Sequence, residues 1–327
     1  RLVKYACEEV DSRLLAVLFD RYSFFLHCEA IKRYMFTAQG DFISHLMDNM
    51  KDTLMEPASY LLKSEYMLAG KLEAAIRASN AQYEDPQMLE CLNVKCSKGI
   101  GEGERGWDVF CLSYDVGEPL STVFTPEAMM SYKRIFKLLW DIKHVEHSLA
   151  GAWHVMKPNT CHNKHAMGGS NAALWNDIRR RMSLRSEMSH FTTNLQYYIV
   201  FEVLEGNWDV FVGSIRKAKD LDQLIEAHDT FLRTVVRKSL LDAESSSLHA
   251  KVYRLFAVMH RFSRLVERIN GAVEDAEQLR RLRRSEGKWV HGREEFPVPD
   301  EELCEFKRNL DSIQQEYNSE LDSFVAM

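Results

Sequence analysis

Hydrophobic and polar residues change their spacing partway along Trp107–Leu149, and this change predicts a strand followed by a helix. Apolar and polar positions alternate over Val109–Val116, which is typical of a strand with one buried face. Gly117 and Pro119 interrupt the alternation. A second short apolar run, Leu120–Phe124, follows at the distance expected for a β-hairpin.

A long helix is predicted directly after this run. Thr125 is a good N-cap, Pro126 suits the first helical position, and Glu127 places an acid in the first turn. Apolar residues then recur at spacings of three and four to about Trp153, and they include Met129, Tyr132, Ile135, Phe136, Leu139, Ile142, Val145 and Leu149. We expect a broad apolar face with Phe136 on its inward stripe.

The same periodicity covers most of the remaining chain. The region 10–35 predicts one helix or two helices in line, because Arg21 interrupts its apolar repeat. Residues 197–204 are apolar nearly all round apart from Glu202, which is typical of a helix at the centre of a bundle. Residues 92–95 predict a strand that pairs with 109–115. Further helices are predicted from 41, from 57 to 80, at 184–198, 220–238 and 248–276, and from 301.

The predicted fold class is therefore mainly α, an elongated helical bundle with a small β-hairpin or short sheet inserted around 92–124. The elongation follows from the helix at 248–276, which spans roughly 43 Å at about 1.5 Å per residue. We expect one domain with three parts: a first helical layer at 1–90, the β element at 91–124, and a second helical layer at 125–327 with loops at 157–171 and 286–300.

Composition narrows the class of protein. The 327 residues are 46% hydrophobic and 28% charged, which fits a soluble globular protein with its own core. No run of eighteen apolar residues occurs, so we expect no transmembrane helix and no membrane partner. The seven cysteines are an odd number without paired spacing, which predicts reduced cytosolic thiols. Arg1 in place of a methionine suggests a piece of a longer chain.

Three short motifs suggest chemistry, and each has a simpler interpretation. Cys161, His162 and His165 have metal-ligand spacing but lack a second ligand pair, so a loop is favoured. The glycines of 99–103 resemble a phosphate loop without its lysine and following helix. The basic run 280–284 has no interleaved aromatic residues, and the net charge is −6. We therefore predict no cofactor, no metal, no nucleic-acid partner and no enzymatic activity.

These segments carry a resemblance to a known family. Trp107–Leu149 resembles the second signature motif of the gamma-tubulin complex proteins, in which V-F-T-x-E-x-M-x-x-Y precedes L-W-x-x-K-x-x-E-x-x-L. Matching residues are Val123, Phe124, Thr125, Glu127, Met129, Tyr132, Phe136, Leu139, Trp140, Lys143, Glu146 and Leu149. Asp11–Tyr22, Gln39–Met47 and Asn194–Glu205 are similar to other segments of the family. Among its subfamilies, the component three sequences are the most similar.

The resemblance implies a function. It implies a non-enzymatic scaffold whose C-terminal half binds gamma-tubulin in a ring that nucleates microtubules at the centrosome or spindle pole. The other complex components would be partners, mainly through an N-terminal half that this chain does not match. The family's closing F-R-L-D-F-N-like segment does not follow Met327. Two alternatives remain open: a cytosolic helical adaptor for another partner, and a metal-dependent enzyme that uses His162 and His165.

Two groups of residues are candidates for contact with gamma-tubulin. Gln39, Gly40, Asp41 and Phe42 form a predicted turn between helices, where a rigid bundle can present groups to a partner. The alternative is a helix junction whose glycine is needed only for its φ angle. Basic residues on the outer side of the long helix form the second group, because tubulins are acidic: Lys133, Arg134 and Lys137.

Overall fold

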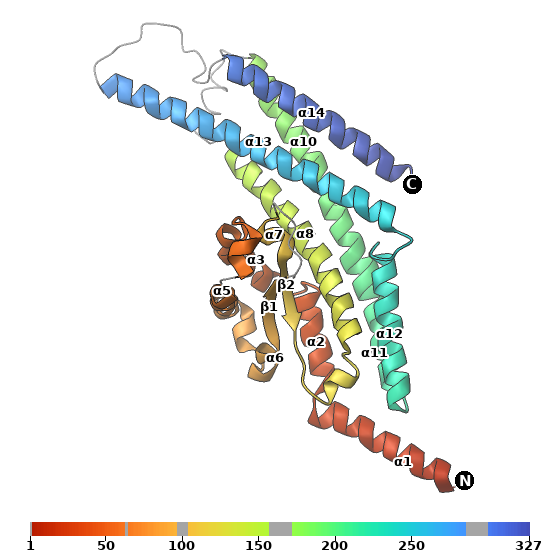
Figure 1. The fold of residues 1–327 in the computed structure, drawn as a ribbon. Coiled ribbons are helices and arrows are strands. Elements are labelled where there is room, and N and C mark those ends of the chain that lie inside the picture. The colour runs from red at the N-terminus through yellow and green to blue at the C-terminus, as the bar shows by residue number, and fades with distance from the viewer. Residues whose placement is uncertain (1, 63–64, 97–103, 157–171, 286–299) are drawn as a thin grey trace. The chain divides into compact units, whose positions relative to one another are not determined.

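The computed structural model describes residues 2–62, 65–96, 104–156, 172–285 and 300–327. The chain divides into two compact units. Unit 1 comprises Arg1–Asp141 and Tyr197–Ala243, and unit 2 comprises Ile142–Gln196 and Glu244–Met327. Helices dominate both units, and a two-stranded sheet lies in unit 1 (Figure 1). The predicted fold class, mainly α with a small β element, is confirmed.

Unit 1 begins with two helices that a short π-helix and a break separate. The elements are α1 (Leu2–Ala16), the short π-helix η1 (Val17–Arg21) and α2 (Phe24–Met35). Ser23, with φ of 49°, adopts a left-handed conformation between them. Non-glycine residues rarely adopt this conformation, so Ser23 marks a definite break. Of the two options that the sequence left open for 10–35, two helices are present, but they meet at an angle and are not in line (Figure 1).

Four helical elements follow before the sheet. They are α3 (Gly40–Leu54), α4 (Ala58–Leu62), α5 (Glu65–Ala78) and α6 (Pro86–Glu90), with the 3₁₀ turn η2 (Asn80–Tyr83) ahead of α6. Side-chain caps begin η2 and α6. The Ser79 hydroxyl accepts from Ala81 N at 3.4 Å, and the Asp85 carboxylate accepts from Gln87 N at 2.9 Å. These bonds satisfy N–H groups that a helix start leaves without a partner.

The sheet pairs β1 (Leu92–Cys96) with β2 (Phe110–Tyr114) in antiparallel register, from Leu92 opposite Tyr114 to Cys96 opposite Phe110. This confirms the predicted pairing. The short helix α7 (Gly106–Val109) leads into β2, so Val109 is helical. Gly106 requires the absence of a side chain, because a Cβ there would lie 2.8 Å from the Leu54 Cα atom.

The second strand predicted at Leu120–Phe124 is wrong. The segment forms the 3₁₀ turn η3 (Leu120–Thr122) and runs into the next helix. Leu120, Val123 and Phe124 are all buried at the spacing of a helical turn, and a half-buried strand cannot bury two consecutive side chains on one face. Short apolar runs do not distinguish a strand from a helical turn by periodicity.

The long helix α8 (Pro126–Met156) begins as predicted, with the Thr125 hydroxyl accepting from Ala128 N at 3.2 Å. Its first half belongs to unit 1. Phe136 and Trp140 are fully buried there with ring centroids 5.8 Å apart, and Phe110 of β2 lies 4.8 Å from Trp140. The sheet therefore packs on α8 through aromatic side chains.

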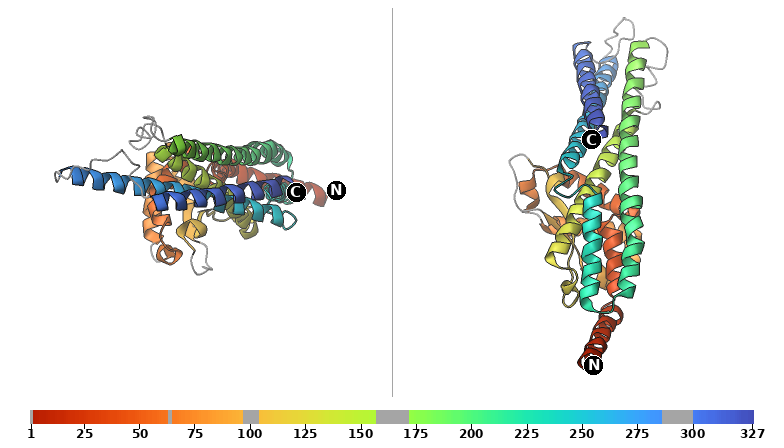
Figure 2. Two further views of the ribbon diagram at one scale, coloured as in Figure 1. Left: turned by 90° about the horizontal axis from the view of Figure 1, so that it is seen from above. Right: turned by 90° about the vertical axis from the view of Figure 1, so that its right-hand side faces the viewer.

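The later part of unit 1 contains the π-helix η4 (Tyr198–Glu205), α11 (Gly206–Lys217) and α12 (Leu221–Lys238). Asp220 caps α12 by accepting from Gln223 N at 2.7 Å, and the Gln223 side chain accepts from Lys219 N at 3.2 Å. Helices α11 and α12 lie side by side in both views (Figures 1 and 2). Phe211 and Phe231 stack between them with centroids 4.5 Å apart.

Unit 2 contains the second half of α8, α10 (Ala172–Tyr197), α13 (Ser246–Ser285) and α14 (Asp300–Val325). Helices α13 and α14 lie side by side (Figure 2). Apolar side chains of α14 are buried at spacings of three and four: Phe306, Leu310, Ile313 and Tyr317. Arg254 and Arg261 of α13 form ion pairs with Glu320 and Glu316 of α14. The pair is held by an apolar seam with charged flanks.

In the described residues we find no helix with the length and apolar character that crossing a membrane requires.

Phe136→Ala tests the apolar face of α8. The Phe136 side chain is fully buried, and truncation of a buried phenylalanine typically costs about 3–5 kcal/mol of unfolding free energy. We expect a markedly lower melting temperature by circular dichroism. Met130→Ala is the matched control, because Met130 lies on the same helix and is 64% exposed. Equal melting temperatures for the two variants would show that this face is not core.

A buried histidine couples the stability of unit 1 to pH. His228 of α12 is fully buried and shares a hydrogen bond of 2.9 Å between its Nε2 atom and the Tyr132 hydroxyl of α8. Burial lowers the pKa of His228 from 6.5 to about 4, because the charged ring would lose its hydration. At neutral pH the ring is therefore uncharged in the folded chain.

We expect acid to destabilise the chain through His228. As the pH falls from about 6.5 towards 4, His228 becomes protonated in the unfolded chain but stays neutral in the folded chain. The unfolding free energy therefore falls by up to about 1.4 kcal/mol per pH unit. The unfolding free energy, measured by urea unfolding at several pH values, should depend less steeply on pH in His228→Gln. His45→Gln, at an exposed position, should keep the wild-type slope. Parallel slopes for all three proteins would contradict the assignment.

Candidate partner-binding surfaces

The first candidate surface is the turn between α2 and α3, here called the Gln39 turn and comprising Gln39, Gly40, Asp41 and Phe42. Gln39 N donates to Arg33 O at 3.1 Å, and Ile43 N donates to Gln39 O at 3.2 Å. Phe42 is fully buried with its ring 5.2 Å from that of Tyr34, so it anchors the turn in the core. Gly40 is exposed, whereas Gln39 and Asp41 are half-buried.

Asp41 ties the turn to a neighbouring segment. Its carboxylate accepts a hydrogen bond of 2.8 Å from Asn80 N at the start of η2. This bond lowers the pKa of Asp41 below its usual 3.8, because a donated N–H stabilises the charged form. The negative charge also lies in the first turn of α3, where it complements the helix dipole.

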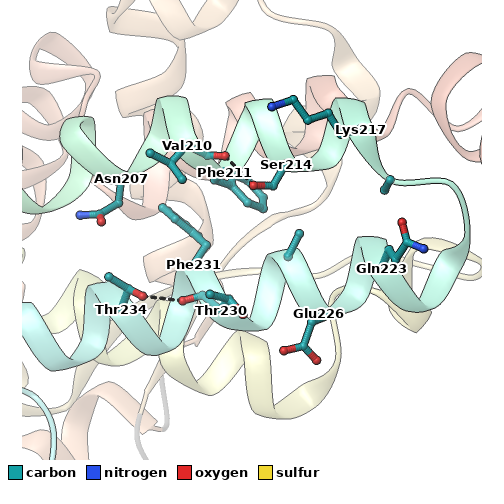
Figure 3. Close-up of a pocket in the computed structure, with 12 residues that line it drawn as sticks. Asn207, Val210, Phe211, Ser214, Lys217, Gln223, Glu226, Thr230, Phe231 and Thr234 are labelled. Carbon is teal, nitrogen blue, oxygen red and sulfur yellow. Dashed lines mark hydrogen bonds between the residues drawn. The ribbon is translucent and has the colours of Figure 1, made fainter.

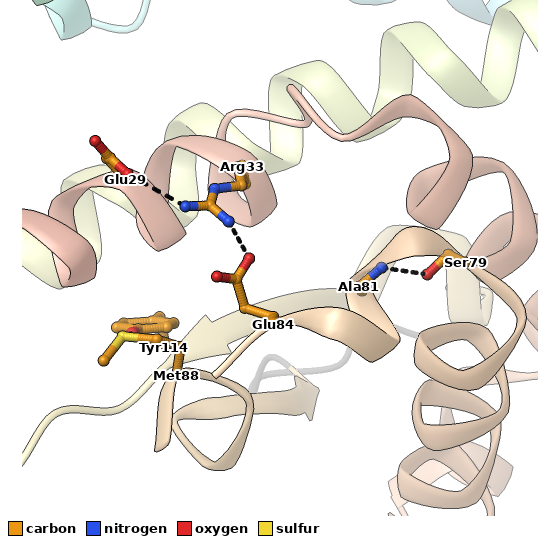
Figure 4. A network of polar contacts seen from close by, with 7 residues as sticks. All are labelled: Glu29, Arg33, Ser79, Ala81, Glu84, Met88 and Tyr114. Carbon is orange, nitrogen blue, oxygen red and sulfur yellow. Dashed lines mark hydrogen bonds and ion pairs between the residues drawn. The ribbon is translucent and has the colours of Figure 1, made fainter. Parts of the chain in front are cut away.

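Arg33, in the last turn of α2, makes a second bond to this segment (Figure 4). Its guanidinium forms an ion pair with Glu84, which follows η2, and lies 3.3 Å from Glu29 on its own helix. The segment around η2 is thus bonded to both helices that flank the turn. We infer that the exposed backbone of the Gln39 turn is held in one conformation.

Gly40 does not supply an unusual backbone angle. Its φ lies outside the left-handed region, and a Cβ built there meets no atom within 4 Å. The left-handed residue near this turn is Thr37, with φ of 55°. The alternative that the turn needs a glycine for its φ angle is therefore wrong.

The second candidate surface is the basic group, comprising Lys133, Arg134 and Lys137 of α8. Lys137 Nζ donates to Trp107 O at 2.8 Å and pairs with Asp141 at 2.6 Å. The Arg134 guanidinium donates to Leu241 O. Both side chains thus bind carbonyl groups that are distant in sequence, and Lys133 is half-buried. Two of the three cations therefore contribute to the fold as well as to the surface charge.

A third surface was missed by the sequence prediction, which placed 197–204 at the centre of a bundle. Ile199, Val203 and Leu204 are buried, but Tyr197 and Phe201 are 58% and 56% exposed. Their rings stack with centroids 5.2 Å apart. The π-helical turn of η4 changes which positions share a face, and the exposed aromatic run was the available signal. Exposed aromatic residues are enriched at protein interfaces.

The candidate metal ligands Cys161, His162 and His165 lie outside the described residues, and so does the glycine segment 99–103. The part of the chain that is described contains no cluster of three or more histidine, cysteine or acidic residues able to hold a metal ion. The cysteines Cys7, Cys28, Cys91, Cys111 and Cys304 are free thiols.

Comparisons with known proteins agree with the sequence motifs. A family model described as "Gamma tubulin complex component C-terminal" matches residues 25–327. Gamma-tubulin complex component 3 of Arabidopsis thaliana is 42% identical over 338 residues, covering 100% of this chain and 40% of the relative. The component 3 of Homo sapiens is 36% identical over 92% of this chain and 33% of the relative.

A fungal relative extends the range of similar proteins. The spindle pole body component alp6 of Schizosaccharomyces pombe is 34% identical over 74% of this chain and 29% of the relative. The chain thus spans two fifths or less of the length of these three relatives. The resemblance to the component three sequences is confirmed.

Asp41→Asn tests whether the carboxylate fixes the Gln39 turn. The amide keeps one acceptor oxygen but loses the charge, and a charge-assisted hydrogen bond contributes about 1.5–3 kcal/mol at most. Because Asp41 is partly solvated, we expect a loss of about 1 kcal/mol in urea unfolding. Asp52→Asn, at an exposed position of the same helix, should leave the unfolding free energy unchanged. Equal losses for the two variants would remove Asp41 from this role.

Proposed function

Because the chain belongs to the gamma-tubulin complex component family, we propose that it is a non-enzymatic scaffold that binds gamma-tubulin and helps to position it for microtubule nucleation. The observation that carries this proposal is the family match over residues 25–327, which covers nearly the whole chain. The family is a structural component of the gamma-tubulin complex. The remaining complex components are the other proposed partners.

The cellular location follows from the relatives. One of them is named as a spindle pole body component, which is a microtubule organising centre. We place this chain at the same kind of structure, in the cytoskeleton of the cytoplasm. The chain spans 40% of the Arabidopsis protein, so the partners and activities of that whole protein come to this chain as a proposal.

The basic group and the Gln39 turn, without the fully buried side chain of Phe42, are the proposed contacts with gamma-tubulin. The turn presents an exposed backbone whose conformation is fixed by Asp41 and Arg33. The basic group places three cations along one helix, which suits an acidic partner by electrostatic complementarity. Lys133 is the best of the three for substitution, because Arg134 and Lys137 also bind the carbonyls of Leu241 and Trp107 and their loss would affect the fold.

We expect the 327-residue chain to bind gamma-tubulin one to one without forming rings. In this family the resemblance assigns lateral assembly to the N-terminal half, and nucleation gains from several gamma-tubulins held at high effective concentration. Light scattering should give the mass of a one-to-one complex. A turbidity assay should show a lag close to that of free gamma-tubulin. Ring-sized particles, or a strongly shortened lag, would show that this chain carries its own assembly surface.

Lys133→Glu tests whether the basic group contacts gamma-tubulin in that complex. Reversal of one partly exposed charge at an interface should weaken binding about two- to fivefold and reduce its salt dependence. Lys51→Glu, on the exposed side of α3, is the matched charge control. Failure of the unmodified chain to bind would favour the adaptor alternative. Equal affinities for both variants would move the contact away from α8.

A further inference from the structure

A groove runs between α11 and α12 in unit 1, and we propose that it binds an amphipathic α-helix of a partner protein (Figure 3). The groove has a volume of about 470 Å³. It shares no residue with the Gln39 turn or the basic group, so the inference does not depend on gamma-tubulin binding. Four features carry it: the spacing of its walls, its apolar floor, its small side chains and its charges.

The walls are two helix faces of matching length. Helix α11 lines the groove from Asn207 to Lys217, followed by its C-cap Ala218, and α12 lines it from Gln223 to Thr234. The lining residues of each helix recur at spacings of three and four. Each wall is therefore about three turns, or roughly 17 Å, long. Ridges of side chains at this spacing accept the ridge of a third helix, which is how grooves between helices bind helical peptides.

The floor and one rim are apolar. Phe211 and Phe231 stack across the groove with an interplanar angle of 20°, which fixes their rings before any partner binds. Val210 is 68% exposed on the rim, an unusual position for a large aliphatic side chain. Phe211 and Phe231 are only 2% and 4% exposed, so a helix that covers the groove would gain free energy mainly by burying Val210.

The remaining lining is small and internally bonded. The Ser214 hydroxyl donates to Val210 O at 2.8 Å, and the Thr234 hydroxyl donates to Thr230 O at 2.7 Å. A partner that covers these groups therefore leaves no hydroxyl proton without an acceptor. Together with Ala218 and Ala227, they allow a helix backbone to approach closely.

The charges specify the partner further. Among the described lining residues, Lys217 of α11 and Glu226 of α12 carry charge on opposite walls (Figure 3). Their opposite signs make the lining neutral, which disfavours a phosphate or nucleic-acid ligand. Glu226 pairs with Arg233 at 3.2 Å, but both side chains are largely exposed and such a pair contributes little. The partner helix should place an acid towards Lys217 and a base towards Glu226.

Two designed peptides test the proposal on the 327-residue chain. Each is an alanine-rich helix of about 16 residues, long enough to form in water, with leucines at spacings of three and four. The matched peptide carries Glu to face Lys217 and Arg to face Glu226, and the exchanged peptide swaps them. Fluorescence anisotropy should show about tenfold tighter binding of the matched peptide, the size expected for two charge pairs of about 0.7 kcal/mol each.

Variants of the groove complete the experiment. Val210→Asp should weaken the matched peptide at least tenfold, whereas Val325→Asp, at an exposed position of α14, should not change its affinity. The double variant Lys217→Glu/Glu226→Lys should reverse the preference between the peptides, so a folding defect in Val210→Asp leaves the proposal testable. Absence of binding, equal binding of both peptides, or an unchanged preference in the double variant would overturn it.

Discussion

The burial of one aromatic stripe on the first half of α8 is the interaction on which unit 1 depends. Tyr132, Phe136 and Trp140 lie at four-residue spacing and are fully buried. The stripe contacts β2 through Phe110 and α12 through His228. These contacts join segments that are far apart in the sequence, and burial of large side chains is the main source of stability in a domain of this kind. Both candidate surfaces are built on elements that this core holds.

Local signals in the sequence predicted the parts of the fold that local chemistry decides. Spacing and residue type predicted the Thr125 cap, a helix starting at Asp220 and the pairing of β1 with β2. The sequence did not decide whether 10–35 forms one helix or two, and the break at Ser23 decides it. The turn η3 was mistaken for a strand, because burial of Leu120 and its neighbours depends on tertiary packing. The exposed face of η4 was missed, because a π-helical turn has no simple sequence signature.

In the candidate surfaces too, the sequence predicted the local features but not the contacts made on folding. Sequence reasoning located the Gln39 turn, but it did not predict that Phe42 is a core side chain or that Asp41 binds the backbone of Asn80. It placed the basic group on α8, but Leu241 lies more than one hundred positions after Arg134. Such long-range partners depend on the folded topology, and a single sequence contains no direct record of them.

Native-state hydrogen exchange on the 327-residue chain tests most directly whether the aromatic stripe of α8 is the most stable part of unit 1. The amides of Tyr132–Trp140 should be among the slowest to exchange and should open only with global unfolding. The amides of α1, whose residues are mostly exposed, should exchange much faster. Exchange in α8 as fast as in α1, while α3 or α12 stays protected, would contradict the central place given to this helix.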